Sequence, residues 1–329
     1  MHIRNLGMPT RRTLVVLGAG ATRGASFVGD SGQLHPPPLD ADFFRLLSRS
    51  PAGRSQQARA LLKYVAKNHS SVLDVSMEAI FVELQGSADF YEQFNIGRGR
   101  IVREPQRTIE HFYRVLPAVM KHSVTDSCAH HEAIAASLES GDAIISFNYD
   151  CLIDRALKLK GARRWNPDSG YGLALNDGTD EWKQWGGGPD ASEPIKLLKL
   201  HGSLNWEFDS TGAVSLLPDP YDRDSAAGAV VPPLGRKPVS EEPFLQAWRA
   251  AREVVRRTER LIVIGYSLPA ADYLVRSLFR ADVDNDRLKE LLVVDPASAV
   301  ADRFLQLLTT PPSRIETMRS LGEFASWLE

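Results

Sequence analysis

The sequence predicts a doubly wound, Rossmann-like α/β fold with a parallel sheet of about six strands and a helical insertion between the first two strands. Two observations support this fold class. Short, continuous runs of apolar and largely β-branched residues recur along the 329-residue chain, and segments with helical spacing separate them. Strands buried on both faces of a helix-covered parallel sheet have this unbroken apolar character.

The predicted strands are bounded by residues that favour turns, such as Gly, Asn, His and Asp. They cover residues 14–17, 143–147, 195–200, 261–264, 291–294 and, with a weaker pattern, 314–318. Runs of this length between turn-forming residues are typical of strands. Because helical segments alternate with them, we expect helices on both faces of the sheet.

More than a hundred residues separate the first two predicted strands, which is too long for a single crossover helix. Most of this segment has helical spacing, as in LLKYVAKNH, MEAIFVELQ and HEAIAASLE. We therefore expect an inserted helical layer over residues 50–140 that covers one side of the cleft, and a Rossmann-like domain formed by residues 1–49 and 141–329. Residues 166–194 and 218–238 lack periodicity, and we expect long loops there.

The composition is that of an ordinary globular protein. Apolar residues make up 43% of the chain, and nearly balanced charges leave a net charge of -2, so neither nucleic-acid nor membrane binding is indicated. The first residues lack the apolar stretch of a signal peptide, and no run approaches the length of a membrane span. We therefore expect a cytoplasmic protein.

The chain has two cysteines, too few for a disulfide framework or for the paired C-x-x-C ligands of a zinc ribbon. One group of metal-ligating residue types consists of His111, His122, Cys128, His130 and His131. These residues lack the spacing of paired ligands, so we expect no metal site. The second cysteine, Cys151, has no histidine near it in sequence, and we interpret it as a small core residue.

Each of the first five predicted strands runs directly into a short motif of small or polar residues. The motifs are Gly18-Ala19-Gly20-Ala21-Thr22, Asn148-Tyr149-Asp150, His201-Gly202-Ser203, Gly265-Tyr266-Ser267 and Asp295-Pro296. Ligands of open parallel sheets bind in a crevice at the carboxyl ends of the strands. We therefore expect the five motifs to line one ligand-binding crevice.

The motif that begins at Gly18 has two interpretations. A G-x-G turn at a helix start brings backbone N–H groups close to a pyrophosphate, but it also occurs as an ordinary strand-to-helix connection. The third glycine of the dehydrogenase fingerprint is displaced, with Arg23 in its place and Gly24 one residue later, and Asp40 and Asp42 follow three prolines rather than a second strand. The chain also lacks the G-K-[ST] sequence of a P-loop. After a buried strand, the motif favours dinucleotide binding.

His201 directly follows an apolar strand and precedes a glycine that lets a ligand approach. Imidazole changes protonation near neutral pH, so His201 is a candidate general base, although a single histidine is more often structural. Asn148 and Asp150 flank Tyr149, so on a continuing strand their side chains share one face. At a helix start, either residue instead caps the helix that begins near Cys151. The sequence leaves these two roles of Asp150 open.

The segments GAGAT, FNYD, KLHGS and IGYSLPAAD occur in this order, and together they resemble the sirtuin-like NAD-binding domain. The resemblance spans nearly the whole chain outside the helical insertion. It implies that the glycine turn binds the NAD phosphates and that Asn148 and Asp150 contact the nicotinamide and its ribose. It further implies that His201 and Gly202 form the H-G motif that supplies the catalytic base.

Two later motifs of the resemblance are less specific. The turn Gly265-Tyr266-Ser267 matches a G-x-S turn at the adenosine ribose, and Asp295 matches a loop that lies against the adenosine. The closer likeness is to bacterial sirtuin-like proteins of antiviral defence, with their PPPLDADFF, FNYDCLIDRAL and IGYSLPAAD segments, and family members of that kind hydrolyse NAD. The chain lacks the four zinc-ribbon cysteines of protein-deacylating sirtuins, and DFF replaces their D-F-R. The resemblance therefore implies an anti-phage NAD hydrolase that depletes NAD.

NAD is an N-glycoside whose leaving group departs as neutral nicotinamide, so the general acid of ordinary glycosidases is dispensable. We expect His201 to activate water or a ribose hydroxyl, while Asn148 and Asp150 orient the ribose and the carboxamide. The expected products are nicotinamide and ADP-ribose, with NAD as substrate and no metal. Two alternatives stay open, namely an NAD-dependent protein deacylase and a non-enzymatic sensor of NAD or an ADP-ribose-like ligand.

Constitutive NAD hydrolysis harms a host cell, yet the sequence shows no separate sensor domain. We therefore expect control in trans, through a homo-oligomer or a partner defence protein such as an ATPase or an Argonaute-like sensor. Direct nucleic-acid binding is not expected.

Overall fold

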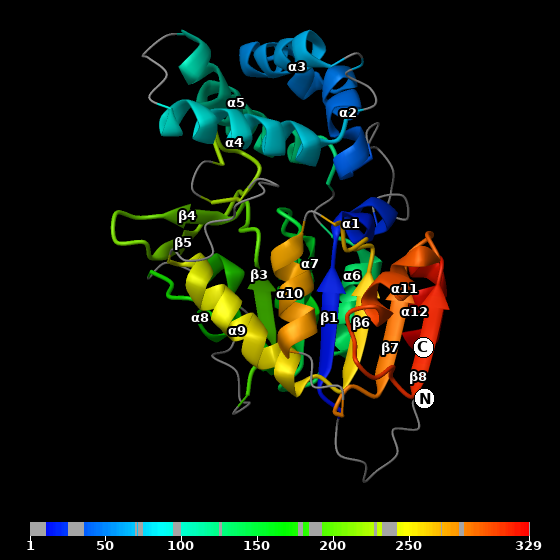
Figure 1. Ribbon diagram of the computed structural model, residues 1–329. Coiled ribbons are helices and arrows are strands. Elements are labelled where there is room, and N and C mark those ends of the chain that lie inside the picture. The colour runs from blue at the N-terminus through cyan, green and yellow to red at the C-terminus, as the bar shows by residue number, and fades with distance from the viewer. Residues whose placement is uncertain are drawn as a thin grey trace.

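The computed structural model describes residues 11–25, 36–69, 71, 75–94, 100–124, 127–176, 180–183, 193–226, 229–231, 242–270, 272–282 and 286–328. A six-stranded sheet forms the centre of the molecule, and a group of helices stands beyond one end of its strands (Figure 1).

All six strands of the central sheet are parallel to their neighbours. The strands are β1 (Thr13–Leu17), β2 (Ala143–Ser146), β3 (Lys196–Lys199), β6 (Arg260–Ile264), β7 (Glu290–Val294) and β8 (Arg314–Met318). Their spatial order is β3-β2-β1-β6-β7-β8, which is the Rossmann order, with the first strand of the chain beside the second and the fourth of the sheet. The predicted fold class and its six strands are confirmed.

The burial of the strands explains why most of them are visible in the sequence. Every side chain of β1 from Leu14 to Leu17 is at most 1% exposed, and all of β2 is buried. The edge strand β8 is mostly exposed, with charged residues among its five. A strand covered on both faces needs an unbroken apolar sequence, whereas an edge strand with an exposed side does not.

Helices cover both faces of the sheet. One face carries α9 (Phe244–Arg257), α10 (Tyr273–Asp282) and α11 (Ala299–Leu305). The other face carries α1 (Ala19–Ala25), α6 (Ala129–Ser137), α7 (Leu152–Lys160) and α12 (Leu321–Leu328). On the first face, the rings of Phe279 and Phe304 join α10 to α11 with centroids 5.5 Å apart.

A helical layer lies over the carboxyl ends of the strands (Figure 1). It consists of η1 (Asp40–Asp42), α2 (Phe43–Arg49), η2 (Pro51–Arg54), α3 (Gln56–Asn68), α4 (Met77–Gln93) and α5 (Arg100–Lys121). The ring of Phe112 lies 5.5 Å from that of Phe43 and 4.6 Å from that of Phe81 between centroids, so one aromatic cluster joins α2, α4 and α5. Tertiary packing of apolar faces, rather than helix propensity, stabilises helices of this length.

The helices between β1 and β2 divide into two groups by their contacts. α6 packs mainly on α7 at the sheet, whereas α3 and α4 pack on α5 in the helical layer. Within the predicted insertion of residues 50–140, α6 is thus a sheet-covering helix. The division of the chain into two folding units stays a prediction.

A small antiparallel hairpin lies beside the sheet and has no counterpart in the sequence analysis. Its strands are β4 (Trp206–Phe208) and β5 (Val214–Leu216), which are too short to produce a sequence pattern. The segment expected to be a long loop contains α8 (Pro167–Gly170) and η4 (Asp180–Trp182), preceded by η3 (Ala162–Arg164). Parts of both expected loops, 177–179, 184–192, 227–228 and 232–238, lie outside the described residues.

None of the helices in the described ranges is both long enough and apolar enough to cross a membrane.

Candidate functional site

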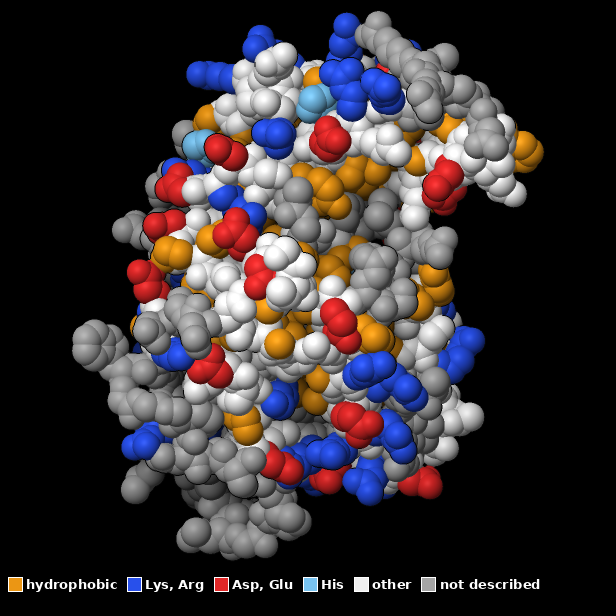
Figure 2. All heavy atoms as spheres, turned by 90° about the vertical axis from the view of Figure 1, so that its left-hand side faces the viewer, with side chains coloured by type: hydrophobic (Ala, Val, Ile, Leu, Met, Phe, Trp, Pro, Cys, Tyr) orange, Lys and Arg blue, Asp and Glu red, His pale blue; other side chains and the backbone are white. Residues whose placement is uncertain are grey.

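A cavity of about 850 Å³ lies at the carboxyl ends of the strands, between the sheet and the helical layer. It spans the boundary between β1 and β6, where the strand order reverses, and this is the place where doubly wound sheets bind ligands. Viewed from the side of β4 and β5, the molecule is hollowed beneath the helical layer, and hydrophobic side chains gather there (Figure 2). Its position and volume are those of a small-molecule site.

The structure brings residues from all five strand-end motifs together in this cavity. The residues of the predicted site that line it are Ala19, Gly20, Thr22, Asn148, Asp150, His201, Gly265, Tyr266, Ser267 and Asp295. They meet because the carboxyl ends of neighbouring parallel strands lie at one edge of the sheet. Their roles toward a ligand stay predictions.

Gly18, Ala21 and Gly202 lie behind the cavity wall rather than on its surface. A Cβ atom on Gly18 would lie 2.5 Å from the Gly265 carbonyl oxygen, and Ala21 is completely buried. Gly202 has a φ of 80°, and a Cβ atom on it would lie 2.2 Å from the Ala229 carbonyl oxygen. These residues therefore fix the course of the backbone that carries the lining side chains.

The glycine turn after β1 packs directly on the turn after β6. The Gly20 N–H donates to the Gly265 carbonyl oxygen at 2.9 Å, and Gly265 has a left-handed φ of 59°. A Cβ atom on Gly265 would lie 2.2 Å from the Ala21 nitrogen. This close contact between the two turns is enough to explain the glycines at positions 20 and 265. The geometry is therefore compatible both with a pyrophosphate-binding turn and with an ordinary strand-to-helix connection.

The side-chain amide of Asn148 is held in one orientation. Its Nδ2 donates to the Gly18 carbonyl oxygen at 2.9 Å and to Thr22 Oγ1 at 3.0 Å. Because a carbonyl oxygen only accepts, these bonds fix Nδ2 toward the glycine turn and leave Oδ1 on the other side. Oδ1 is buried without a hydrogen-bond partner in the described part of the chain. An unsatisfied buried acceptor costs about 1–3 kcal/mol, which a donor from a ligand or water offsets.

The carboxylate of Asp150 joins two elements at the cavity wall. Thr22 Oγ1 donates to its Oδ2 at 2.7 Å, and the backbone N–H of Leu152 donates to its Oδ1 at 3.0 Å. The second bond satisfies a free N–H at the start of α7, as a capping residue does. The first bond completes a chain of side chains from Asp150 through Thr22 to Asn148. Asp150, one residue before the N-cap Cys151, thus both accepts a bond from the first turn of α7 and orients the Asn148 amide through Thr22.

His201 is confined by aromatic rings and faces an acidic side chain. The rings of Phe147 and Tyr266 stack with centroids 4.2 Å apart, and the His201 ring lies 5.0 Å from that of Phe147. The His201 Nε2 atom is 3.9 Å from Asp272 Oδ1, and the histidine is 8% exposed. Packing fixes the ring in place, and its remaining exposure is toward the cavity that it lines.

Three carboxyl groups that the sequence analysis did not assign to the site also line the cavity, namely those of Asp40, Glu78 and Asp272. Burial raises the pKa of Asp40, hydrogen bonds from the Glu78 amide and the Ser76 side chain oppose this shift, and the nearby Asp272 adds to it. Asp40 and Asp272 belong to the PPPLDADFF and IGYSLPAAD segments. Those segments were visible in the sequence, but nothing in the sequence places Asp272 beside His201.

His130 of α6 also lines the cavity, which its polar helical sequence did not indicate. Its Nε2 atom is buried and has no partner among the residues that the structure describes, and burial lowers its pKa. The described residues contain no group of three or more His, Cys, Asp or Glu side chains that could hold a metal ion. Because His130 lines the cavity, its Nε2 atom is a candidate hydrogen-bonding contact for a ligand.

Arg23 occupies the position of the missing third glycine and lines the cavity. Its guanidinium forms an ion pair with Asp42, which also pairs with Arg45 at 3.1 Å. The other oxygen of Asp42 accepts from the Leu39 N–H at 2.8 Å. Asp42 thus fixes both the η1 turn and the side chain of Arg23 at the cavity wall.

Cys151 lies in the core behind the cavity. It is completely buried, and its Sγ is 3.8 Å from Ser203 Oγ. Burial raises the pKa of the thiol to about 12. Because the thiolate is the reactive form of cysteine, this residue is not prepared for nucleophilic attack.

His131 is expected to make the folded protein sensitive to acid. It is 1% exposed, and burial lowers its pKa to about 4 from 6.5. Between these values the unfolded chain binds the proton and the folded chain does not, so stability present above pH 6.5 is lost as the pH falls, by up to about 3 kcal/mol. Urea unfolding at pH 7 and pH 4.5 should show a smaller pH-dependent loss for His131→Asn than for the wild type. An equal loss in both proteins, with His122→Asn as control, contradicts the prediction.

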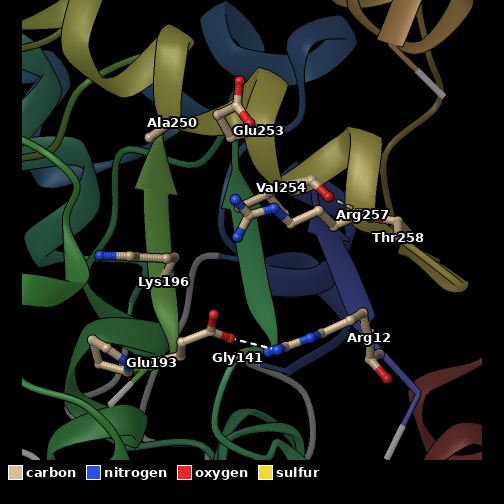
Figure 3. Close-up of a pocket in the computed structure, with 11 residues that line it drawn as sticks. Arg12, Gly141, Glu193, Lys196, Ala250, Glu253, Val254, Arg257 and Thr258 are labelled. Atoms are coloured by element: carbon tan, nitrogen blue, oxygen red, sulfur yellow. Dashed lines mark hydrogen bonds and ion pairs between the residues drawn. The ribbon is translucent and has the colours of Figure 1, made fainter. Parts of the chain in front are cut away.

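A second, smaller cavity of about 300 Å³ lies at the opposite, amino end of the strands. Figure 3 shows Arg12 and Glu193 paired across it, with Lys196, Glu253 and Arg257 on its other walls. Its positive and negative side chains nearly balance. Because doubly wound sheets bind ligands at the carboxyl ends of their strands, we place the candidate site in the larger cavity.

No protein-family model matches the chain, and no curated protein matches it. Several solved structures are similar to it at low sequence identity. A Sir2 complex with an inhibitor, 2'-O-acetyl-ADP-ribose and a deacetylated p53 peptide is 15% identical, over 97% of this chain and 92% of that chain, with a TM-score of 0.39. A Sir2 homolog–NAD complex is 14% identical, over 96% of this chain and 86% of that chain, also with a TM-score of 0.39. At this distance the likeness transfers neither an activity nor a ligand to this chain.

Proposed function

We propose that this protein is an NAD glycohydrolase, which cleaves the bond between nicotinamide and ribose and releases nicotinamide and ADP-ribose. The observation that carries the proposal is the presence of both Asn148 and His201 in the wall of one cavity. A buried amide oxygen without a hydrogen-bond partner among the described residues and a confined imidazole line the same space at the switch point of a Rossmann-ordered sheet. A substrate hydroxyl, a carboxamide N–H or water can donate to that amide oxygen.

The order of the motifs across the sheet supports a dinucleotide as the ligand. From one side of the sheet to the other, the strand ends carry the His201 and Gly202 motif, the Asn148 and Asp150 motif, the glycine turn, and then the two later motifs. The proposed nicotinamide end therefore lies over β3 and β2, and the pyrophosphate lies over β1. The adenosine end lies over β6 and β7, so the motifs follow the order of groups along an extended dinucleotide.

Each part of the dinucleotide has proposed contacts. The turn Gly18-Ala19-Gly20-Ala21-Thr22 holds the pyrophosphate, with Ala19, Gly20 and Thr22 at the cavity surface. Gly265-Tyr266-Ser267 and Asp295 contact the adenosine and its ribose, while Asn148 and Asp150 orient the nicotinamide ribose and the carboxamide. The hydrogen bonds from Asn148 to Thr22 and from Thr22 to Asp150 support this last role, because they fix the amide before the ligand arrives.

In the proposed reaction, the bond between the ribose C1′ and the nicotinamide nitrogen breaks, and its electron pair neutralises the pyridinium ring. Water attacks C1′ as the oxocarbenium-like centre forms. His201 accepts the proton that this water releases and returns it to solvent. One NAD and one water thus yield one nicotinamide, one ADP-ribose and one proton, and the reaction uses no metal.

The proposal is tested by mixing the purified chain with NAD and measuring free nicotinamide. We expect a His201→Ala variant to release nicotinamide at least about 100-fold more slowly while its dissociation constant for NAD changes little. Robust hydrolysis by this variant contradicts the role of His201 as general base. Tight NAD binding without turnover, also at high protein concentration, indicates a sensor, and release that requires an acyl-lysine peptide indicates a deacylase.

The proposal extends to the cellular role, in which NAD depletion in the cytoplasm acts against phage infection. Because unregulated NAD loss harms the host, we place control of the activity in trans, in a homo-oligomer or a partner defence protein. Specific activity measured alongside mass in solution tests this control. A monomer as active as any assembly contradicts control by oligomerisation.

A further inference from the structure

Asp272 places a buried carboxylate beside the proposed base. It immediately precedes α10, in the loop that follows β6, and it is 6% exposed. Its Oδ1 atom lies 3.9 Å from Nε2 of His201. This distance exceeds that of a hydrogen bond to a neutral ring, but it is within the range at which a carboxylate attracts a protonated one.

The carboxylate is held in this direction by its neighbours. The hydroxyl of Tyr266 donates to Asp272 Oδ2 at 2.7 Å, so one oxygen is engaged while the other faces His201. Tyr266 is itself fixed, because its ring stacks on Phe147. The backbone of Asp272 is fixed as well, since its N–H donates to the Pro269 carbonyl oxygen at 3.1 Å. Phe147, Tyr266 and Asp272 therefore form one rigid support for the imidazole.

We infer that Asp272 is a positioning residue of the proposed hydrolase, which holds the His201 ring and stabilises the imidazolium that forms when His201 accepts the proton of the attacking water. The inference rests on the proposed function. The attraction between Asp272 and His201 is strongest once the ring is charged, so it favours the transition state over the bound substrate. Asp272 does not itself take the proton.

Other ionisable groups line the same cavity from the elements packed around it. They include the carboxyl groups of Asp40, Glu78, Asp150 and Asp295, the ring of His130, the hydroxyls of Tyr149 and Tyr266, and the guanidinium groups of Arg23 and Arg319. Asp40 is the group most directly linked to Asp272, because the charge of Asp272 helps to raise its pKa. When that charge is removed, Asp40 ionises more readily and partly replaces it. An Asp40→Asn/Asp272→Asn double variant removes both charges and should show a larger effect than Asp272→Asn alone.

The kinetic test compares Asp272→Asn with the wild type and with Asp89→Asn, which changes an exposed aspartate on α4. Asparagine keeps an oxygen for the Tyr266 hydroxyl but removes the charge. We expect kcat to fall by about 10- to 100-fold with KM within about threefold, and the acid limb of the kcat/KM profile to move about one pH unit lower. A wild-type rate and pH profile in Asp272→Asn overturns the inference and leaves the proposed function intact.

A second measurement does not depend on hydrolysis. NMR titration of the histidine rings, with the His201 signal assigned through a His201→Gln variant, gives the pH at which His201 is half protonated. We expect this pH to be about one unit lower in Asp272→Asn than in the wild type and unchanged in Asp89→Asn. An unchanged midpoint in Asp272→Asn overturns the pairing even if the protein hydrolyses NAD. A shifted midpoint in a protein without hydrolysis supports the pairing and rejects the proposed function.

Discussion

An Asn148→Ala variant is expected to lose NAD hydrolysis by on the order of 100-fold or more while it stays folded. The substitution removes the Oδ1 acceptor, which has no partner in the described part of the chain, and the two bonds from Nδ2 to Gly18 and Thr22. Under the proposed function, the nicotinamide ribose and the carboxamide then lose the contact that orients them. Nicotinamide release, the dissociation constant for NAD and the melting temperature measure the effect.

Two further variants separate positioning by Asn148 from a loss of stability. Thr22→Val removes the hydroxyl that joins Asn148 to Asp150 but keeps the Oδ1 acceptor, so we expect a smaller loss of activity. Asn68→Ala changes an exposed asparagine at the end of α3 and should leave hydrolysis unchanged. Full activity in Asn148→Ala contradicts the role of Asn148 on which the proposed function depends.

A Lys199→Met variant is expected to have the largest effect on stability, a loss of about 3–5 kcal/mol in the free energy of unfolding. Lys199 and Asp154 are both 0% exposed, and their charged atoms are 3.0 Å apart. Burial opposes the charge on Lys199, but the neighbouring acidic groups, with Asp154 the strongest of them, together outweigh it, and the pKa of Lys199 is raised. Methionine leaves Asp154 charged and buried without its cationic partner. The Tyr171 hydroxyl still donates a hydrogen bond to Asp154 Oδ1 at 2.5 Å.

Urea unfolding at neutral pH measures this loss. A Lys199→Met/Asp154→Leu double variant removes both charges and should recover much of the stability. Burying the ion pair costs desolvation free energy, and removing only one partner leaves an uncompensated buried charge, so removing both avoids each cost. Lys63→Met, on the exposed side of α3, is the matched control. A loss below about 1 kcal/mol in Lys199→Met, the value typical of exposed ion pairs, contradicts the prediction.

The parallel sheet was predictable because its strands are buried on both faces. Burial on both sides requires unbroken apolar sequence, and β1, β2, β6 and β7 contain such runs. In the edge strand β3, the apolar pair Leu197 and Leu198 stands between two lysines. The strand-end motifs were predictable for a related reason, since the chain must turn where each strand leaves the core. The β4–β5 hairpin was not predictable, because two strands of three residues do not produce a pattern.

The sequence by itself determined the fold class, the strand order along the chain and the residue types at the strand ends. Only the tertiary structure decided which of these residues meet. It placed Asp272 beside His201 and left Asn148 Oδ1 without a partner in the described residues. It also brought the backbones of Gly18 and Gly265 into close contact. Such contacts join segments far apart in the chain, and local sequence patterns describe only the secondary structure of each segment. The sequence therefore predicts which residues belong to the site, and the folded chain decides the distances and hydrogen bonds between them.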